Sequence, residues 1–312
     1  MRPLLQKPFV QALLVVAVIL GGTYLLFGPG PSTPNENMEN MEDMMDDQPV
    51  AQSHRSYEVE AVSSLSNIQP NQPRNFIYKI KDDQGSILKD FDVVHEKVMH
   101  FIVARKDLQY FQHLHPSFDS TTGEFVIPIT FASDGDYRAF ADFTPSMSQV
   151  GPDGTKLPVT IFKDIKVGNL AIYKPLPIDE TERVKTYGDY EITLVPSSDS
   201  ITSKNNQNFD FEIRKNGELV TNLQTYLGAL GHTVVLREGN LQFVHAHATQ
   251  KPTDLQTGKV SFAITFPEAG NYKLFSQFQH EDKIITSDFV VNVAEGKENP
   301  SNSAPHGGTQ QH

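Results

Sequence analysis

HFIVARKDLQYFQHLHP, residues 100–116, recurs as HTVVLREGNLQFVHAHA, residues 232–248. Further along, GEFVIPITFASDGDYRAFADF (123–143) matches GKVSFAITFPEAGNYKLFSQF (258–278), and three histidines coincide in the first pair of stretches. A repeat unit of about 110 residues predicts two folded domains rather than a solenoid, because each copy is large enough to bury its own core. The coinciding histidines are His100, His113 and His115 in the first copy, and His232, His245 and His247 in the second.

Each copy has the pattern of an all-β domain. Short runs rich in Val, Ile, Phe and Tyr alternate with polar residues, and turn signals such as Asp134-Gly135 separate them. About seven strands in a unit of this length are typical of an immunoglobulin-like sandwich. We therefore predict an all-β protein with two tandem immunoglobulin-like β-sandwiches, residues 56–170 and 187–295, joined by a linker at 171–186.

The N-terminal region predicts a membrane anchor. Residues 9–27, FVQALLVVAVILGGTYLLF, carry no charge, and a helix of about 20 apolar residues spans a bilayer. Arg2 and Lys7 precede the run, so the positive-inside rule places residues 1–8 in the cytoplasm as a short stub. We predict a transmembrane signal anchor at 9–27, with the C-terminal domains outside the cytoplasm. A cleaved signal peptide is the alternative, although its apolar region is usually shorter.

Polar segments flank the two copies. Residues 28–55 hold several acids and prolines, so we expect a disordered tether, and the polar residues 296–312 predict a disordered tail. Four of the seven methionines lie in the tether, and thioethers are ligands that suit Cu(I). A plain acidic linker is the other interpretation. The four are Met38, Met41, Met44 and Met45.

Composition excludes several functions. The 38 acidic residues outnumber the 26 basic ones, which argues against nucleic-acid binding. The absence of cysteine excludes disulfides, thiolate metal sites and cysteine nucleophiles. No nucleophile-elbow, HExxH, P-loop or dinucleotide-binding motif occurs, so we predict that the protein is not an enzyme. A three-histidine site that activates water would need a base, and spacing singles out neither Glu96 nor Asp107.

The spacing of the histidines predicts two convergent clusters. A two-residue turn at Lys106-Asp107 would place His100 opposite His113, with β-carbons about 4.5–5.5 Å apart. His115 would then project from the same face. The same arithmetic around Glu238-Gly239 pairs His232 with His245, with His247 beyond. These faces also carry apolar residues, and we expect them to line each core: Ile102, Ala104 and Phe111, and Val234, Leu236 and Phe243.

Clustered imidazoles near a core need partners. Each buried polar ring without one would be destabilising by about 1–3 kcal/mol. Either a metal ion satisfies the rings, or they bond to backbone carbonyls or to one another and pin the hairpin. Imidazole suits Cu(II) and Zn(II), and the absence of cysteine with the nearby methionines favours copper, with zinc as the alternative. The predicted metal ligands are His100, His113, His115, His232, His245 and His247, followed in second rank by His95, Met99 and His280.

HEKVMHFIVARKDLQYFQHLHP (95–116) and YLGALGHTVVLREGNLQFVHAHA (226–248) resemble a bacterial family of membrane-anchored or secreted, His-bearing β-sandwich proteins. This largely uncharacterised family is loosely similar to YtkA-like and copper-handling periplasmic domains. The resemblance covers most of residues 57–294 and implies the fold and an extracytoplasmic location; it implies copper by association. Pro116 after His115 fits the family, whereas Ala248 departs from it.

Two functions of different classes follow. The first is a membrane-anchored, non-catalytic protein that binds a transition metal, most simply copper, and passes it to another envelope protein. The second is a surface interaction or assembly module built of tandem immunoglobulin-like domains, in which the histidines are purely structural. A metal titration separates them, because a pure interaction module has no stoichiometric metal site.

Overall fold

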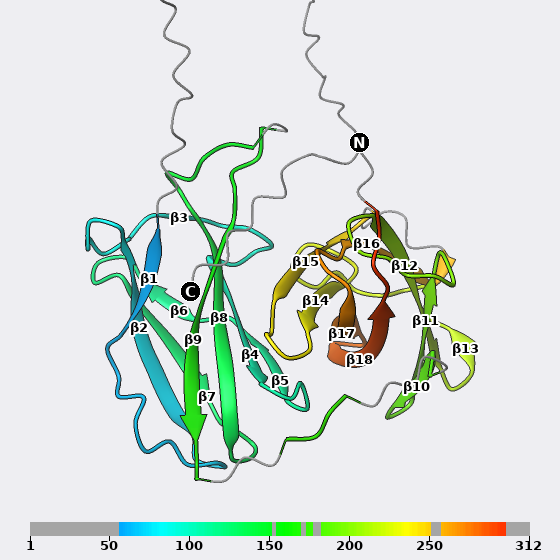
Figure 1. Ribbon diagram of the computed structural model, residues 1–312, viewed down its shortest axis with the longest axis horizontal. Coiled ribbons are helices and arrows are strands. Elements are labelled where there is room, and N and C mark those ends of the chain that lie inside the picture. The colour runs from blue at the N-terminus through cyan, green and yellow to red at the C-terminus, as the bar shows by residue number, and fades with distance from the viewer. Residues whose placement is uncertain (1–55, 152–153, 170–172, 177–181, 251–256, 298–312) are drawn as a thin grey trace, which may run out of the picture. The chain divides into compact units, whose positions relative to one another are not determined.

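The computed structural model describes residues 56–151, 154–169, 173–176, 182–250 and 257–297. The side chains of His245 and His247 lie outside this description, as do the predicted anchor, the tether and the tail from residue 298 onward. All regular structure in the described residues is β-strand, which confirms the all-β prediction (Figure 1). Across these ranges no helix is long and apolar enough to cross a membrane.

The first copy contains two antiparallel sheets. One has the order β1-β2-β7-β6, and the other has the order β3-β8-β4-β5 with β9 paired to β8. This two-sheet arrangement agrees with the predicted sandwich. The strands are β1 Tyr57–Ala61, β2 Arg74–Asp82, β3 Phe91–Asp92, β4 Met99–Arg105, β5 Phe111–Leu114, β6 Ser117–Asp119, β7 Glu124–Ile129, β8 Gly135–Pro145 and β9 Val159–Val167.

The second copy repeats this order in one continuous path. Its sheet runs β10-β11-β12-β16-β15-β14-β17-β18, with β13 paired to β12. The path is continuous because β15 pairs with both β14 and β16. The strands are β10 Val184–Tyr187, β11 Tyr190–Pro196, β12 Asn206–Lys215, β13 Glu218–Leu219, β14 His232–Arg237, β15 Phe243–Ala248, β16 Lys259–Thr265, β17 Gly270–His280 and β18 Lys283–Val293.

Each copy has its own aromatic core, but the histidine-bearing face of β4 does not line it. The core of the first copy takes Met99, Phe101 and Val103 from β4, the residues that alternate with His100 and Ile102. The expectation that Ile102, Ala104 and Phe111 face the core is therefore wrong, and so is its counterpart in the second copy. These residues belong to a third apolar cluster, which joins the two copies.

The contact between the copies has approximate two-fold character. Phe111 stacks on Phe275 with ring centroids 4.2 Å apart, and the repeat-equivalent residues Phe243 and Phe140 lie 5.5 Å apart. Lys273 Nζ donates to the carbonyl of Leu108 at 2.9 Å, while Arg138, its equivalent, donates to the carbonyl of Asn240 at 3.0 Å. The same surface of each copy thus contacts the other, as in an isologous dimer interface.

The hairpins that carry the histidines are longer at the turn than predicted. Ile102 pairs with His113, and Val234 pairs with His245, so the register differs from the prediction by two residues. The predicted pairings of His100 with His113 and of His232 with His245 are therefore wrong. Each loop contains four residues, 106–109 and 238–241, closed by hydrogen bonds from Arg105 N to Tyr110 O and from Arg237 N to Gln242 O. A shift of two preserves the face, so the histidines still project together.

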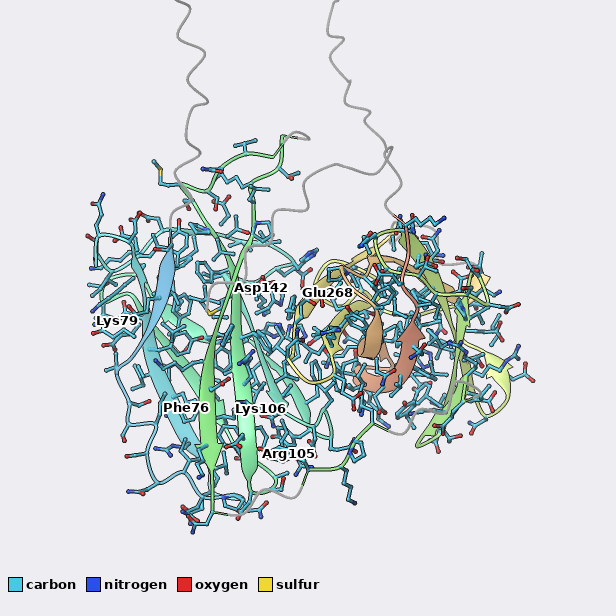
Figure 2. The ribbon with its side chains drawn as sticks, in the orientation of Figure 1. Phe76, Lys79, Arg105, Lys106, Asp142 and Glu268 are labelled. Carbon is cyan, nitrogen blue, oxygen red and sulfur yellow. The ribbon has the colours of Figure 1, made fainter. Side chains whose placement is uncertain are left out.

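A leucine anchors each loop. Leu108 and Leu241 adopt left-handed φ angles of 60° and 56°, and both side chains are buried in the cluster between the copies. In the first loop, Arg105, which lies at the end of β4 (Figure 2), also holds Asp107 through two hydrogen bonds of 2.7 and 2.8 Å. The end of the hairpin is thus fixed by burial and by a bidentate ion pair, and this in turn positions the strands that carry the histidines.

Candidate metal centre

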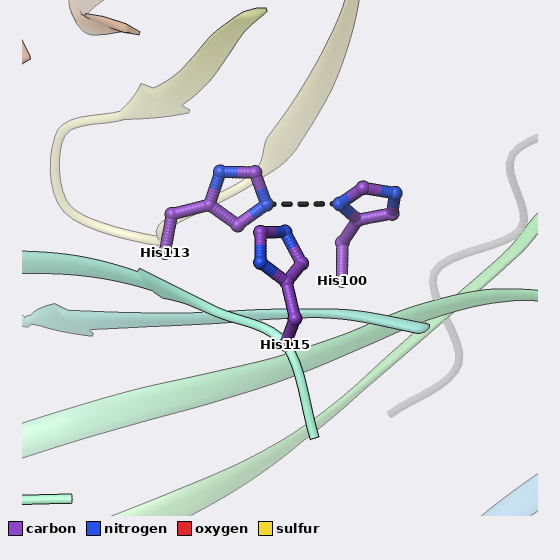
Figure 3. A group of neighbouring side chains, drawn as sticks. All are labelled: His100, His113 and His115. Carbon is purple, nitrogen blue, oxygen red and sulfur yellow. Dashed lines mark hydrogen bonds between the residues drawn. The ribbon is translucent and has the colours of Figure 1, made fainter. Parts of the chain in front are cut away.

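Three histidines of the first copy converge where β4 and β5 lie side by side. His100 is the second residue of β4, His113 lies on β5, and His115 follows β5 (Figure 3). Each offers one ring nitrogen, and these atoms all lie within 4.8 Å of one another. The closest pair is His100 Nδ1 and His113 Nε2, 3.0 Å apart. Among the predicted ligands whose side chains the structure describes, these three form a compact group.

Carbonyl oxygens of the preceding turns orient two of the rings. His100 Nε2 donates to the carbonyl of Val94 at 3.2 Å, and His232 Nε2 donates to the carbonyl of Leu227 at 3.1 Å. A carbonyl oxygen only accepts, so Nε2 carries the hydrogen in both neutral rings. Nδ1 of each ring is consequently unprotonated and presents a lone pair. The two copies orient their first histidine in the same way.

The other two rings have different surroundings. His113 Nδ1 lies 2.8 Å from Oε1 of Gln277, a residue of the second copy. His115 Nε2 is buried and has no hydrogen-bond partner among the described residues. A buried ring nitrogen without a partner is uncommon, because it loses its hydrogen bonds to water and gains none in exchange. Nε2 of His115 is therefore available to bind an ion or a small molecule.

The second copy completes the surroundings of the triad. The His232 ring lies 6.4 Å from that of His100, measured between centroids, and 5.0 Å from that of His95. The centroid of the Tyr226 ring lies 6.5 Å from that of His115 and 5.9 Å from that of His232. The structure thus brings His232 to the cluster of the first copy. We expected one cluster in each copy, and the described side chains form one group to which both copies contribute.

Burial keeps these imidazoles neutral. The pKa of His100 and of His113 falls from 6.5 to about 3, mainly through burial and in smaller part because positive charges on neighbouring rings would repel. The pKa values of His115 and His232 fall to about 4 for the same main reason. Near pH 7 all four rings are therefore unprotonated, which is the form that binds a metal ion.

Two predicted second-rank ligands lie elsewhere. Met99 is buried in the core of the first copy, where its sulfur accepts a hydrogen bond from the Tyr78 hydroxyl at 3.0 Å. His280 uses both ring nitrogens, Nδ1 with the Tyr190 hydroxyl at 2.9 Å and Nε2 with Asn222 Oδ1 at 3.1 Å. Neither residue belongs to the triad. Of His245 and His247 the structure gives the backbone positions on β15.

Gln277 is the residue that sequence reasoning missed. The repeat aligns it with Asp142, and in both copies this position pairs with the first histidine: His232 with Gln277, and His100 with Asp142. The repeat therefore did contain a signal for this position: in both copies a polar residue of one strand lies opposite the first histidine of the next strand. The repeat could not show that Gln277 contacts the other copy, because the sequence does not indicate which faces of the two copies meet.

A family profile described as "Domain of unknown function (DUF8832)" matches residues 52–150 and 185–295. The chain belongs to the DUF8832 family. The two matched segments correspond to the two copies, so the family spans the whole repeat. No curated protein sequence matches the chain.

Solved structures resemble this DUF8832 chain only distantly. A DUF4426 family protein from Pseudomonas aeruginosa PAO1 is 11% identical, with a TM-score of 0.29, and the match covers 37% of this chain and 100% of that one. The Escherichia coli adhesin FdeC is 15% identical over 76% of this chain and 64% of its own, with a TM-score of 0.24. Domains 5–6 of the S-layer protein SbsC are 13% identical, with a TM-score of 0.22, and the match covers 78% of this chain and 100% of that one.

Proposed function

We propose that the protein binds one transition-metal ion through His100, His113 and His115, without catalysis. The observation that carries the proposal is the convergence of three neutral ring nitrogens within 4.8 Å, one of them buried without a hydrogen-bond partner. Two nitrogens bound to one tetrahedral ion at about 2.0–2.1 Å lie about 3.4 Å apart. Small rotations of the rings would bring the three atoms to that spacing, and His232 is the nearest candidate for a fourth ligand.

Copper is the ion that we propose, with zinc as the alternative. Three imidazoles suit either Cu(II) or Zn(II). Met99 is buried in the core and does not support this choice. The preference for copper therefore rests on the four methionines of the tether, which suit Cu(I), and on the absence of cysteine. The resemblance to copper-handling domains points the same way.

The location and partner complete the proposal. Residues 9–27 anchor the chain in the membrane and the two sandwiches lie outside the cytoplasm, where the tether and the metal site exchange copper with another envelope protein. The triad contains imidazoles alone, without a carboxylate that would serve as a general base, which fits storage or transfer better than hydrolysis.

Calorimetric titration of the full-length protein in detergent tests this function. Cu(II), Zn(II) and, under reductant, Cu(I) are titrated into the wild type and into a His100→Ala/His113→Ala variant. We expect one tight equivalent in the wild type that the variant loses. Weak binding in the tether alone would survive in the variant. If the wild type shows no binding beyond that of the variant, the protein is better explained as an interaction module with structural histidines.

A further inference from the structure

We propose that Gln277 is a positioning residue for the metal site, supplied by the second copy to a ligand of the first. Its side-chain oxygen holds His113 in the tautomer that presents Nε2 to the ion. This inference rests on the proposed function and adds to it the reason why the two copies must be docked for the site to be complete.

The contacts of Gln277 define its role. Oε1 lies 2.8 Å from His113 Nδ1, while Nε2 donates to the hydroxyl of Thr286 at 3.1 Å. An amide oxygen only accepts, so His113 Nδ1 carries the hydrogen and His113 Nε2 is left with its lone pair. Metal-bound histidines characteristically donate their second N–H to such an oxygen, which fixes the ring and makes the ligand more basic.

The consequence is an unusual pair of nitrogens. His100 Nδ1 is unprotonated because Nε2 of the same ring donates to Val94. His113 Nε2 is unprotonated because Nδ1 donates to Gln277. These two atoms lie 3.0 Å apart, which is a hydrogen-bond distance, and with both rings in the proposed tautomers two lone pairs would face each other with no hydrogen between them (Figure 3). Such a contact is repulsive on its own and becomes favourable when a cation lies between the two rings.

With the opposite orientation of the same amide, the histidines would instead form a purely structural hydrogen-bond network that holds the hairpin together. Gln277 Nε2 would then donate to His113 Nδ1, His113 Nε2 would donate to His100 Nδ1, and the Thr286 hydroxyl would donate to Gln277 Oε1. Every polar atom in that series of hydrogen bonds has a partner, and no ion is needed. The orientation of one carboxamide therefore separates the metal site from the structural alternative, and it determines which nitrogen of His113 carries the hydrogen.

Three variants of the full-length protein test the role of Gln277, with Zn(II) as the calorimetric probe. Gln277→Leu removes the acceptor, and we expect Zn(II) affinity to fall by about 10–100-fold. Gln277→Glu keeps an acceptor that cannot flip into a donor, so affinity should equal or exceed that of the wild type. Gln207→Leu is the matched control, because Gln207 is also buried and donates to a threonine, Thr202, away from the histidines. It should leave affinity unchanged.

Nitrogen-15 spectra of the metal-free protein give a second readout. We expect His113 to be protonated at Nδ1 in the wild type and in Gln277→Glu, and to populate both tautomers in Gln277→Leu. Protonation at Nε2 in the wild type would overturn the proposal, even if Gln277→Leu failed to fold. Unchanged Zn(II) affinity in a folded Gln277→Leu would overturn it while leaving the proposed function intact. Absence of metal binding in the wild type would remove both.

Discussion

His115 and His280 are both histidines of the sandwiches, but their ring nitrogens have opposite surroundings. His280 is only 5% exposed, and both nitrogens are satisfied by Tyr190 and Asn222. His115 keeps one buried nitrogen without a partner. A hydrogen-bonded buried ring contributes to stability, whereas an unsatisfied one detracts from it. We therefore expect His280 to act structurally and His115 to contribute to the proposed metal site.

Leucine substitutions separate these roles. His280→Leu should lower the free energy of unfolding by about 1–3 kcal/mol, because the Tyr190 hydroxyl and Asn222 lose their partner, and should keep the metal stoichiometry. His115→Leu should cost little stability in the metal-free protein and should weaken metal binding. Denaturant unfolding followed by circular dichroism, together with Zn(II) calorimetry, measures both. A large loss of stability in His115→Leu with unchanged binding would contradict the assignment.

The low pKa values of the cluster predict a pH dependence of stability in the metal-free protein. In the unfolded chain the histidines titrate near 6.5, whereas in the folded protein those of the cluster titrate at about 3–4. Below pH 6.5 the unfolded state therefore binds more protons, and the free energy of unfolding falls as pH falls. Each histidine contributes at most about 1.4 kcal/mol per pH unit, and partly exposed rings contribute less.

Unfolding measured between pH 7.5 and 5 checks this dependence. The slope should be near zero above pH 7 and positive below pH 6. It should be smaller in His115→Leu, which has one fewer titrating ring in the cluster. Measurements stop at pH 5 because carboxylates with lowered pKa, such as Asp164 and Asp288, contribute at lower pH. Equal slopes in the two proteins would show that His115 titrates normally when folded.

At the scale of elements, the strands and the shared face of the histidines could be predicted, whereas the turns and the face of these strands that lines each core could not. Apolar alternation identified the hairpins, and the even spacing of the histidines placed them on one face. The turn rules favour two-residue loops with glycine or asparagine at left-handed positions. Here Leu108 and Leu241 take that conformation, because their burial between the copies offsets its local cost. Local sequence signals do not include such a tertiary effect.

Strand β15 shows a second effect at this scale. It runs unbroken from Phe243 to Ala248, whereas the equivalent part of the first copy is divided into β5 and β6 at His115 and Pro116. Proline has no N–H to donate to a sheet ladder, which accounts for the break. His115 therefore lies just beyond a strand end, where the backbone leaves the sheet. The aligned His247 lies within β15.

The hairpins should be energetically coupled across the two copies. A double-mutant cycle on Phe111→Ala and Phe275→Ala should give a coupling energy of about 0.5–1.5 kcal/mol, because the rings stack at 4.2 Å. The equivalent pair, Phe140 and Phe243, should give a coupling of the same sign. Phe111 with Phe209, which is buried in the core of the second copy, is the control and should be additive. Additivity at the first pair would mean that the copies are not docked in solution.

At the scale of the whole molecule, metal binding and docking should support each other. The triad comes from one copy, whereas Gln277 and His232 come from the other. The duplication was visible in the sequence, but nothing in it indicated that the histidine faces meet. The expectation of one cluster in each copy treated the copies as independent, and the side chains of His245 and His247, which would complete the second cluster, lie outside the described residues.

Zn(II) should therefore stabilise both copies together. At a free ion concentration 100 times the dissociation constant, binding adds about 2.7 kcal/mol to the free energy of unfolding. In calorimetric scans we expect one transition that shifts upward with Zn(II) in the wild type, and a smaller shift in Gln277→Leu at the same concentration. A transition of the second copy that does not respond to Zn(II) would argue against coupling.

The two-fold contact has a further consequence because both partners lie on one chain. Two separate molecules joined by such a surface would come apart on dilution, and any site between them would be lost. Covalent linkage makes the encounter intramolecular, so that it no longer depends on the concentration of the protein. If the site binds metal as proposed, a molecule at low protein concentration would thus hold its ion as firmly as one at high concentration, and its occupancy would follow the supply of metal rather than the abundance of the protein.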